Sequence, residues 1–195
     1  MERAVELSQT ARALAGGQPN AAGALATAIE ARAHARTGDR TKALAAIRRS
    51  EAIFDRLQPW ETEENVLGFY EQLFRFYQSN VLTYIGETKA ALASQQRALE
   101  LSPPEMEIDP VLIRLDRATC LVHEGEVAEG CHSASRALLS LSPEARRGTP
   151  TTRAHELVKM IPSGANRIGA VRDLREILQG ALMPPSLAGS VRGTA

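Results

Sequence analysis

The sequence is poor in the residues that build sheets and membrane spans. Aromatic residues make up only 4% of the 195 residues, and the β-branched residues are scattered. Strands favour both residue types, so nothing resembles a series of strands. No apolar run approaches the roughly 18 residues of a membrane helix. The start of the chain carries Glu2 and Arg3 within a helical pattern, unlike a secretory signal. We therefore expect a cytoplasmic protein with no membrane span.

An excess of charge of one sign is also lacking. The 23 basic residues are balanced by 23 acidic residues. Proteins that neutralise phosphates usually carry a basic excess on one face, so we expect no direct nucleic-acid binding by this chain. The sequence has only two cysteines, Cys120 and Cys131, and we expect both thiols to stay reduced.

Signatures of catalysis and of metal binding are absent or weak. There is no Gly-x-Ser-x-Gly elbow, phosphate-binding loop, dinucleotide fingerprint or His-Glu-x-x-His motif. Cys120 and His123, followed by Cys131 and His132, offer zinc-type ligands. However, neighbours on one helix point about 100° apart, and a free cysteine is commonly a small buried residue. We predict no enzyme, no cofactor and no metal site.

Strong helix formers dominate what is present, chiefly Ala, Leu, Arg and Glu. Glycines, prolines and apolar periodicity divide residues 1–183 into an N-terminal helix, 2–15, and four helical hairpins. Residues 184–195 are small, polar and begin with proline, which predicts a disordered tail. The expected hairpins cover residues of about 22–57, 64–103, 109–143 and 151–182.

A repeated spacing links three of these hairpins. Small residues lie five and twelve positions after each turn glycine. Antiparallel helices approach closely only where small residues face each other, and each hairpin leaves an apolar face for the next one to cover. The positions after Gly38, Gly86 and Gly125 are, respectively, Ala43 and Ser50, Ala91 and Ala98, and Gly130 and Ala137.

This pattern resembles the tetratricopeptide repeat (TPR), a helix–turn–helix unit of about 34 residues. The resemblance implies an all-α fold, a right-handed superhelical stack of antiparallel hairpins (an α-solenoid), with the terminal pieces as caps. Arg75 and Arg114 stand where that family usually has a bulky aromatic residue. A plain helical bundle is the alternative.

Two segments, 73–80 and 115–122, are similar to the C-terminal helical-repeat regions of actinobacterial helix–turn–helix transcriptional regulators. The similarity covers about residues 31–178. It implies a sensor domain, either as part of a longer regulator or as a stand-alone relative without the DNA-binding domain.

The first helices of stacked hairpins line a concave groove in this kind of scaffold, which gives a set of candidate binding residues. Peptide-binding relatives use an asparagine six residues before the turn glycine, which is Asn80 here. Asn80 can equally bond to a neighbouring helix, the tyrosines can fill the core, and the arginines can clamp a carboxylate or be solvated. The candidates are Arg32, Arg36, Phe76, Tyr77, Asn80, Tyr84, Asp116, Thr119 and His123.

We therefore predict a non-catalytic module of a transcriptional regulator, binding a peptide, a protein or a small-molecule effector in the groove. A stand-alone adaptor for protein assembly is the alternative. A weaker alternative is an enzyme with an unrecognised site among Tyr77, Asn80, Asp116 and His123. Apolar residues of the last helix, from Val171 to Leu178, suit either a homodimer face or a cap on the neighbouring helix.

Overall fold

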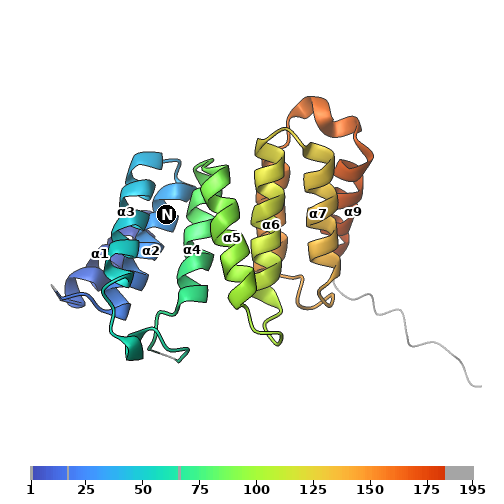
Figure 1. Ribbon diagram of the computed structural model, residues 1–195. Helices are drawn as coiled ribbons and strands as arrows, with labels where there is room; N and C mark the ends of the chain where they lie inside the picture. Colours follow the sequence, from blue (N-terminus) through green and yellow to red (C-terminus); the bar gives the residue numbers. More distant parts are fainter. Residues whose placement is uncertain (1, 17, 66, 183–195) are drawn as a thin grey trace, which may run out of the picture.

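The computed structural model describes residues 2–16, 18–65 and 67–182 (Figure 1). This part of the chain contains nine α-helices, two short 3-10 helices and no strand. The helices are α1 (Glu2–Leu14), α2 (Ala21–Arg36), α3 (Arg40–Phe54), α4 (Glu71–Tyr84), α5 (Thr88–Leu101), α6 (Ile108–His123), α7 (Val127–Leu139), α8 (Thr149–Met160) and α9 (Gly169–Leu182), with 3-10 helices η1 (Pro59–Glu61) and η2 (Ser163–Arg167).

The helices pair in chain order. α2 packs on α3, α4 on α5, α6 on α7 and α8 on α9, while α1 packs on α2. The hairpins follow one another across Figure 1 from blue to red. α2 contacts α4, α4 contacts α6, and α6 contacts α8, so these four helices form a continuous series that we call the first-helix row. The prediction of an all-helical chain of sequential antiparallel hairpins is confirmed.

Glycine and small residues explain the tight hairpins. Gly38, Gly86 and Gly125 have φ angles of 79°, 74° and 90°, which a side chain would disfavour. A Cβ on Gly130 would lie 2.9 Å from the carbonyl oxygen of Ala118, so α6 and α7 approach closely at this point. Ala43 and Ala91 occupy equivalent positions and are fully buried, as the repeated spacing predicted.

The connection before α4 differs from the prediction. We expected this helix to begin near residue 64, but it begins at Glu71. Glu61 ends η1 and is buried, and its carboxylate accepts hydrogen bonds from the backbone N–H groups of Ala21 and Gln58, each at 3.0 Å. The backbone N–H of Phe69 donates to the Glu61 carbonyl at 2.8 Å. These contacts hold the segment against the start of α2 and prevent it from continuing as helix.

Smaller differences concern the helix ends. α6 begins at Ile108, close to the expected start of the third hairpin at about residue 109. η2 lies in the connection between α8 and α9. The predicted tail at 184–195 lies outside the described residues. Within the described segments, none of the helices combines the length and the apolar character required to span a bilayer.

The buried side chains form two clusters that meet at α4. One lies mainly among α2 to α5, includes Cys120 of α6 and is rich in alanine, with Phe69 and Phe74 as its largest members. The other lies mainly among α6 to α9, includes Phe76 of α4 and Ala98 of α5, and contains mostly Leu, Ile and Val. Leu73 and Tyr77 pack against both clusters. The four hairpins therefore share one continuous interior, along which the first-helix row presents its remaining side chains.

Candidate functional site

A buried ion pair connects the third and fourth hairpins. The guanidinium of Arg153 in α8 donates to the Asp116 carboxylate in α6, and the two residues are only 3% and 1% exposed. Asn80 in α4 is also buried, and its Nδ2 donates to Asp116 Oδ2 at 3.0 Å. Burial disfavours the charged form of Arg153, but the charge and hydrogen bond of Asp116 outweigh it and raise the pKa of the guanidinium. The pairing is what allows both charges to lie in the interior.

A second carboxylate joins helices from three hairpins. Glu156 in α8 accepts a hydrogen bond from the Tyr84 hydroxyl in α4 and forms an ion pair with Arg36 in α2. The Arg36 guanidinium lies 5.4 Å from the centre of the Tyr84 ring. Burial raises the pKa of Tyr84, although the neighbouring Arg153 and Arg36 oppose this shift. Side chains from the first and the last hairpin therefore meet over α4.

Arg32 differs from the other arginines of this cluster. Its guanidinium lies 5.9 Å from the centre of the Tyr77 ring, and no carboxylate among the described residues forms an ion pair with it. Burial lowers the pKa of Arg32, and the positive charges of Arg153 and Arg36 lower it further. Arg32 is thus a half-buried cation without an anionic partner in this part of the protein.

Two adjoining hollows open beside Arg32. The first has a volume of about 280 Å³, and two of its lining residues are the α2 arginines Arg32 and Arg36. The second, of about 400 Å³, lies between α1 and α2, and its wall has one polar side chain, Ser8, whose hydroxyl donates to the Val5 carbonyl. Both are lined in part by Ala4 and Ile29, so they adjoin at these residues. The first is lined by Ala4, Ile29, Arg32, Ala33, Arg36 and Tyr77, and the second by Ala4, Leu7, Ser8, Ala11, Ala22, Leu25, Ala26 and Ile29.

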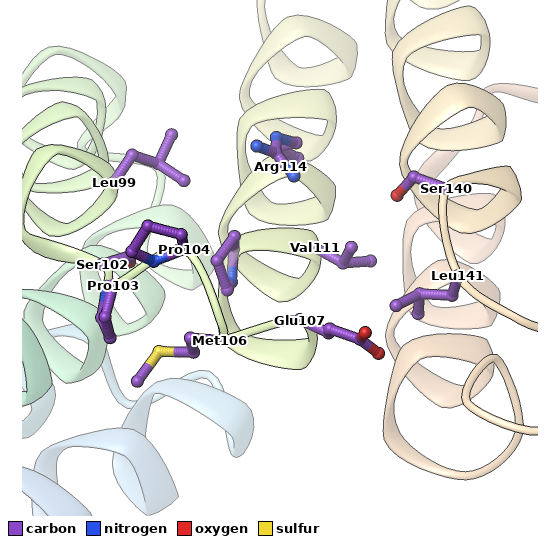
Figure 2. Close-up of a pocket in the computed structure, with 11 residues that line it drawn as sticks. Leu99, Ser102, Pro103, Pro104, Met106, Glu107, Val111, Arg114, Ser140 and Leu141 are labelled. Atoms are coloured by element: carbon purple, nitrogen blue, oxygen red, sulfur yellow. The ribbon is translucent and has the colours of Figure 1, made fainter.

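Another hollow, of about 380 Å³, lies away from this cluster at the proline-rich connection between α5 and α6. Figure 2 shows Leu99, Ser102 and Pro103 on one side of it and Leu141 on the other, with Val111 between them. None of the candidate residues from the sequence lines it. Its charged side chains, those of Glu107 and Arg114, are both exposed. We therefore place the candidate site at the arginine cluster.

The structure gathers most of the candidate residues and separates three of them. Phe76 and Thr119 are buried in the interior, and the Thr119 hydroxyl donates to the Leu115 carbonyl at 3.0 Å. His123 is exposed at the end of α6, and no hydrogen bond or ion pair within the described segments joins it to the cluster. The residues that lie together are Arg32, Arg36, Tyr77, Asn80, Tyr84 and Asp116.

Sequence reasoning missed Arg153 and Glu156, which supply one partner in each of the two ion pairs of this cluster. The fourth hairpin was interpreted as a cap, so its first helix contributed no candidates. A signal was present, because Arg153 and Glu156 lie three residues apart and therefore on one face of that helix.

The two cysteines, Cys120 and Cys131, lie in the interior of the protein. Both thiols are free and buried, and burial raises the pKa of each. Cys120 Sγ lies 3.7 Å from the Thr83 hydroxyl and 3.6 Å from Gln95 Nε2. Across residues 2–16, 18–65 and 67–182, no group of three or more His, Cys, Asp or Glu side chains is arranged to hold a metal ion.

Comparison with known proteins gives no relative, since no protein-family model, curated protein or solved structure matches the chain. The case for a function therefore depends on the residues and their geometry.

Proposed function

We propose that this chain is a binding module built as a TPR-like α-solenoid, whose first-helix row forms the concave, ligand-binding face. The single observation that carries the proposal is the convergence of Arg32, Arg36 and Tyr77 on one hollow, with the charge of Arg32 unmatched. A desolvated cation without a partner is costly to a fold, and binding an anion relieves that cost.

The curvature required by this proposal is supported by one long-range contact. Arg36 belongs to the first hairpin and Glu156 to the fourth, yet their side chains form an ion pair across α4. Straight stacking at 8–10 Å between helices would hold α2 and α8 too far apart for this contact. A curved row brings the ends together, as a superhelical stack of hairpins does.

The same contact supports a regulatory role over a purely structural one. Stacked hairpins touch mainly their neighbours, so the stack can flex as a unit. A ligand that competes with Glu156 for Arg36, or that draws Arg32 toward itself, would alter the distance between the first and fourth hairpins. Such a change suits a sensor domain in a cytoplasmic transcriptional regulator.

A thermal-shift screen tests the proposal. The purified protein is heated with pools of small acids, metabolites and short peptides, in parallel with Arg36→Gln and with Arg114→Gln as a matched control. Arg114 is exposed on α6 and lies outside the cluster. A ligand at about 100 times its dissociation constant adds roughly 2.7 kcal/mol of stability.

We expect at least one hit that raises the melting temperature of the wild type and Arg114→Gln but raises that of Arg36→Gln less. The proposal is overturned if no pool stabilises the protein and cell extract instead yields a stoichiometric protein partner whose binding is unchanged in Arg36→Gln. That result would assign the chain to the adaptor class.

A further inference from the structure

We propose that the two adjoining hollows beside α1 and α2 bind an alkyl carboxylate, with the carboxylate at Arg32 and the alkyl chain between the two helices. This inference rests on the proposed binding function and specifies its ligand class.

The polar end of the site suits one negative charge. Arg32 has no carboxylate partner among the described residues, whereas Arg36 and Arg153 are each already paired. The guanidinium presents a planar fork that matches the two oxygens of a carboxylate. Tyr77 holds it from one side through its ring, 5.9 Å away. One free guanidinium therefore calls for one carboxylate rather than a polyanion.

The apolar end of the site suits a chain without polar groups. Its wall consists of Ala, Leu and Ile side chains, and Ser8 already uses its hydroxyl on the Val5 carbonyl. A peptide placed here would bury backbone N–H and C=O groups without partners, which opposes binding. An alkyl chain has no such groups, and each CH₂ removed from water favours binding.

The stripe along α2 fixes the orientation and length of the ligand. Ala22, Leu25 and Ile29 are followed by Arg32 at spacings of three and four, so all four share one face of the helix. From Ala22 to Arg32 the helix advances about 15 Å, the length of an extended chain of about ten to twelve carbons. Beyond Arg32 the Arg36–Glu156 ion pair crosses the row, which ends the space available to the carboxylate.

The decisive experiment is a calorimetric titration of the full chain with decanoate, below the concentration at which it forms micelles. We expect one molecule bound per chain. Arg32→Gln should weaken binding at least tenfold, whereas Arg114→Gln, with the same change in charge, should stay within twofold of the wild type. Decyltrimethylammonium, which has the same chain and the opposite charge, should not bind at this site.

A second variant tests the apolar end without disturbing the interior. Leu7 is 59% exposed and lines the apolar hollow, so Leu7→Glu should leave the fold intact and place a repelling charge where the chain lies. Decanoate should bind Leu7→Glu at least tenfold more weakly than it binds the wild type. Acetate should bind neither the wild type nor Leu7→Glu measurably. The inference is overturned if decanoate does not bind, or if it binds the wild type, Arg32→Gln and Leu7→Glu equally.

The failure of this inference can be told apart from the failure of the proposed function. If decanoate does not bind but another compound or a peptide stabilises the protein in an Arg36-dependent manner, the ligand class is wrong and the binding function stands. If nothing binds and only an Arg36-independent protein partner is recovered, both are wrong.

Discussion

Arg32 and Arg153 both lie on the first-helix row, yet Arg153 is ion-paired and Arg32 is not. Arg153 is 3% exposed and paired with Asp116, which in turn accepts from Asn80. Arg32 is half-buried, faces a hollow and has no carboxylate partner in the described structure. The pKa of Arg153 is raised by Asp116, whereas burial and two neighbouring cations lower that of Arg32.

This difference separates stability from binding. A charge that is enclosed and ion-paired, as that of Arg153 is through its Nη1, holds the third and fourth hairpins together and is shielded from a ligand. A charge that is partly desolvated and unpaired destabilises the free protein slightly and gains most from a bound anion. The same residue type therefore serves the fold at one end of the row and, in our proposal, the ligand at the other.

The largest expected effect comes from breaking the buried pair. Asp116→Ala leaves the Arg153 charge buried without a partner, and we expect a loss of about 3–5 kcal/mol in the free energy of unfolding. Urea denaturation followed by circular dichroism measures it. The double variant Asp116→Ala with Arg153→Met should recover part of the loss, because no uncompensated charge remains. Arg153→Met alone is measured alongside. If the double variant loses as much stability as Asp116→Ala and Arg153→Met added together, the ion pair is not the source of the effect.

We expect Asn80→Ala to cause the second-largest loss of stability. Its amide donates to Asp116 in the interior, and a hydrogen bond to a charged group contributes about 1.5–3 kcal/mol. We expect Asn80→Ala to destabilise the protein by about that amount, as measured by urea denaturation. In the Asp116→Ala background the same substitution should cost clearly less. An equal cost in both backgrounds would show that the Asn80–Asp116 contact carries no energy.

Tyr84 should have a smaller effect with a distinct dependence on pH. Removing its hydrogen bond to Glu156 in Tyr84→Phe should cost about 1 kcal/mol near neutral pH. Burial raises the pKa of Tyr84, so the folded state resists loss of this proton. Its contribution is fully present below the unfolded-state pKa of about 10 and is lost as the pH rises through the folded-state pKa.

Unfolding curves between pH 8 and about 11 measure this dependence. The wild type should lose more stability than Tyr84→Phe over that range. Tyr70→Phe is the comparison near neutral pH, where it should cost less than Tyr84→Phe, since no hydrogen bond of the Tyr70 hydroxyl is seen in the described residues. Burial and the charges of Glu64 and Asp109 also raise the pKa of Tyr70, so its slope at high pH should fall as well. Identical slopes for the wild type and Tyr84→Phe would contradict the assignment.

The sequence was most informative where local chemistry determines the structure. Gly38, Gly86 and Gly125 marked the three turns correctly because a positive φ requires glycine there. The small residues that follow them at fixed offsets indicated which helix faces pack closely, and this held for Ala43 and Ala91. The start of α4 was wrong because Glu61 satisfies backbone groups of Ala21, forty residues away in sequence, and no local pattern reports such a contact.

The site was predicted only in part for the same reason. Position on the first helices identified Arg32, Tyr77 and Asp116, since the helical period decides which residues share a face. It did not reveal which charges would be paired, because the partners of Asp116 and Arg36 lie in α8, a hairpin interpreted as a cap. That pairing is a tertiary property, and it separates the arginine that serves stability from the one proposed to bind the ligand.

Arg32 should therefore give the smallest change in stability. No carboxylate within the described segments pairs with it, and burial together with Arg153 and Arg36 lowers its pKa. A cation whose pKa is lower in the folded state than in the unfolded state favours unfolding while it is charged. At neutral pH the summed charge interactions of Arg32 therefore do not stabilise the fold, although Tyr77 and Asp116 attract it. We expect Arg32→Gln to change the free energy of unfolding by no more than about 0.5 kcal/mol. Any gain in stability should be larger at low salt than at high salt, because high salt screens the repulsion between the arginines.

Urea denaturation of Arg32→Gln and Arg153→Gln side by side makes the comparison. A loss near that of Arg153→Gln would show that Arg32 is a structural residue, and the ligand would then have to be sought elsewhere on the row.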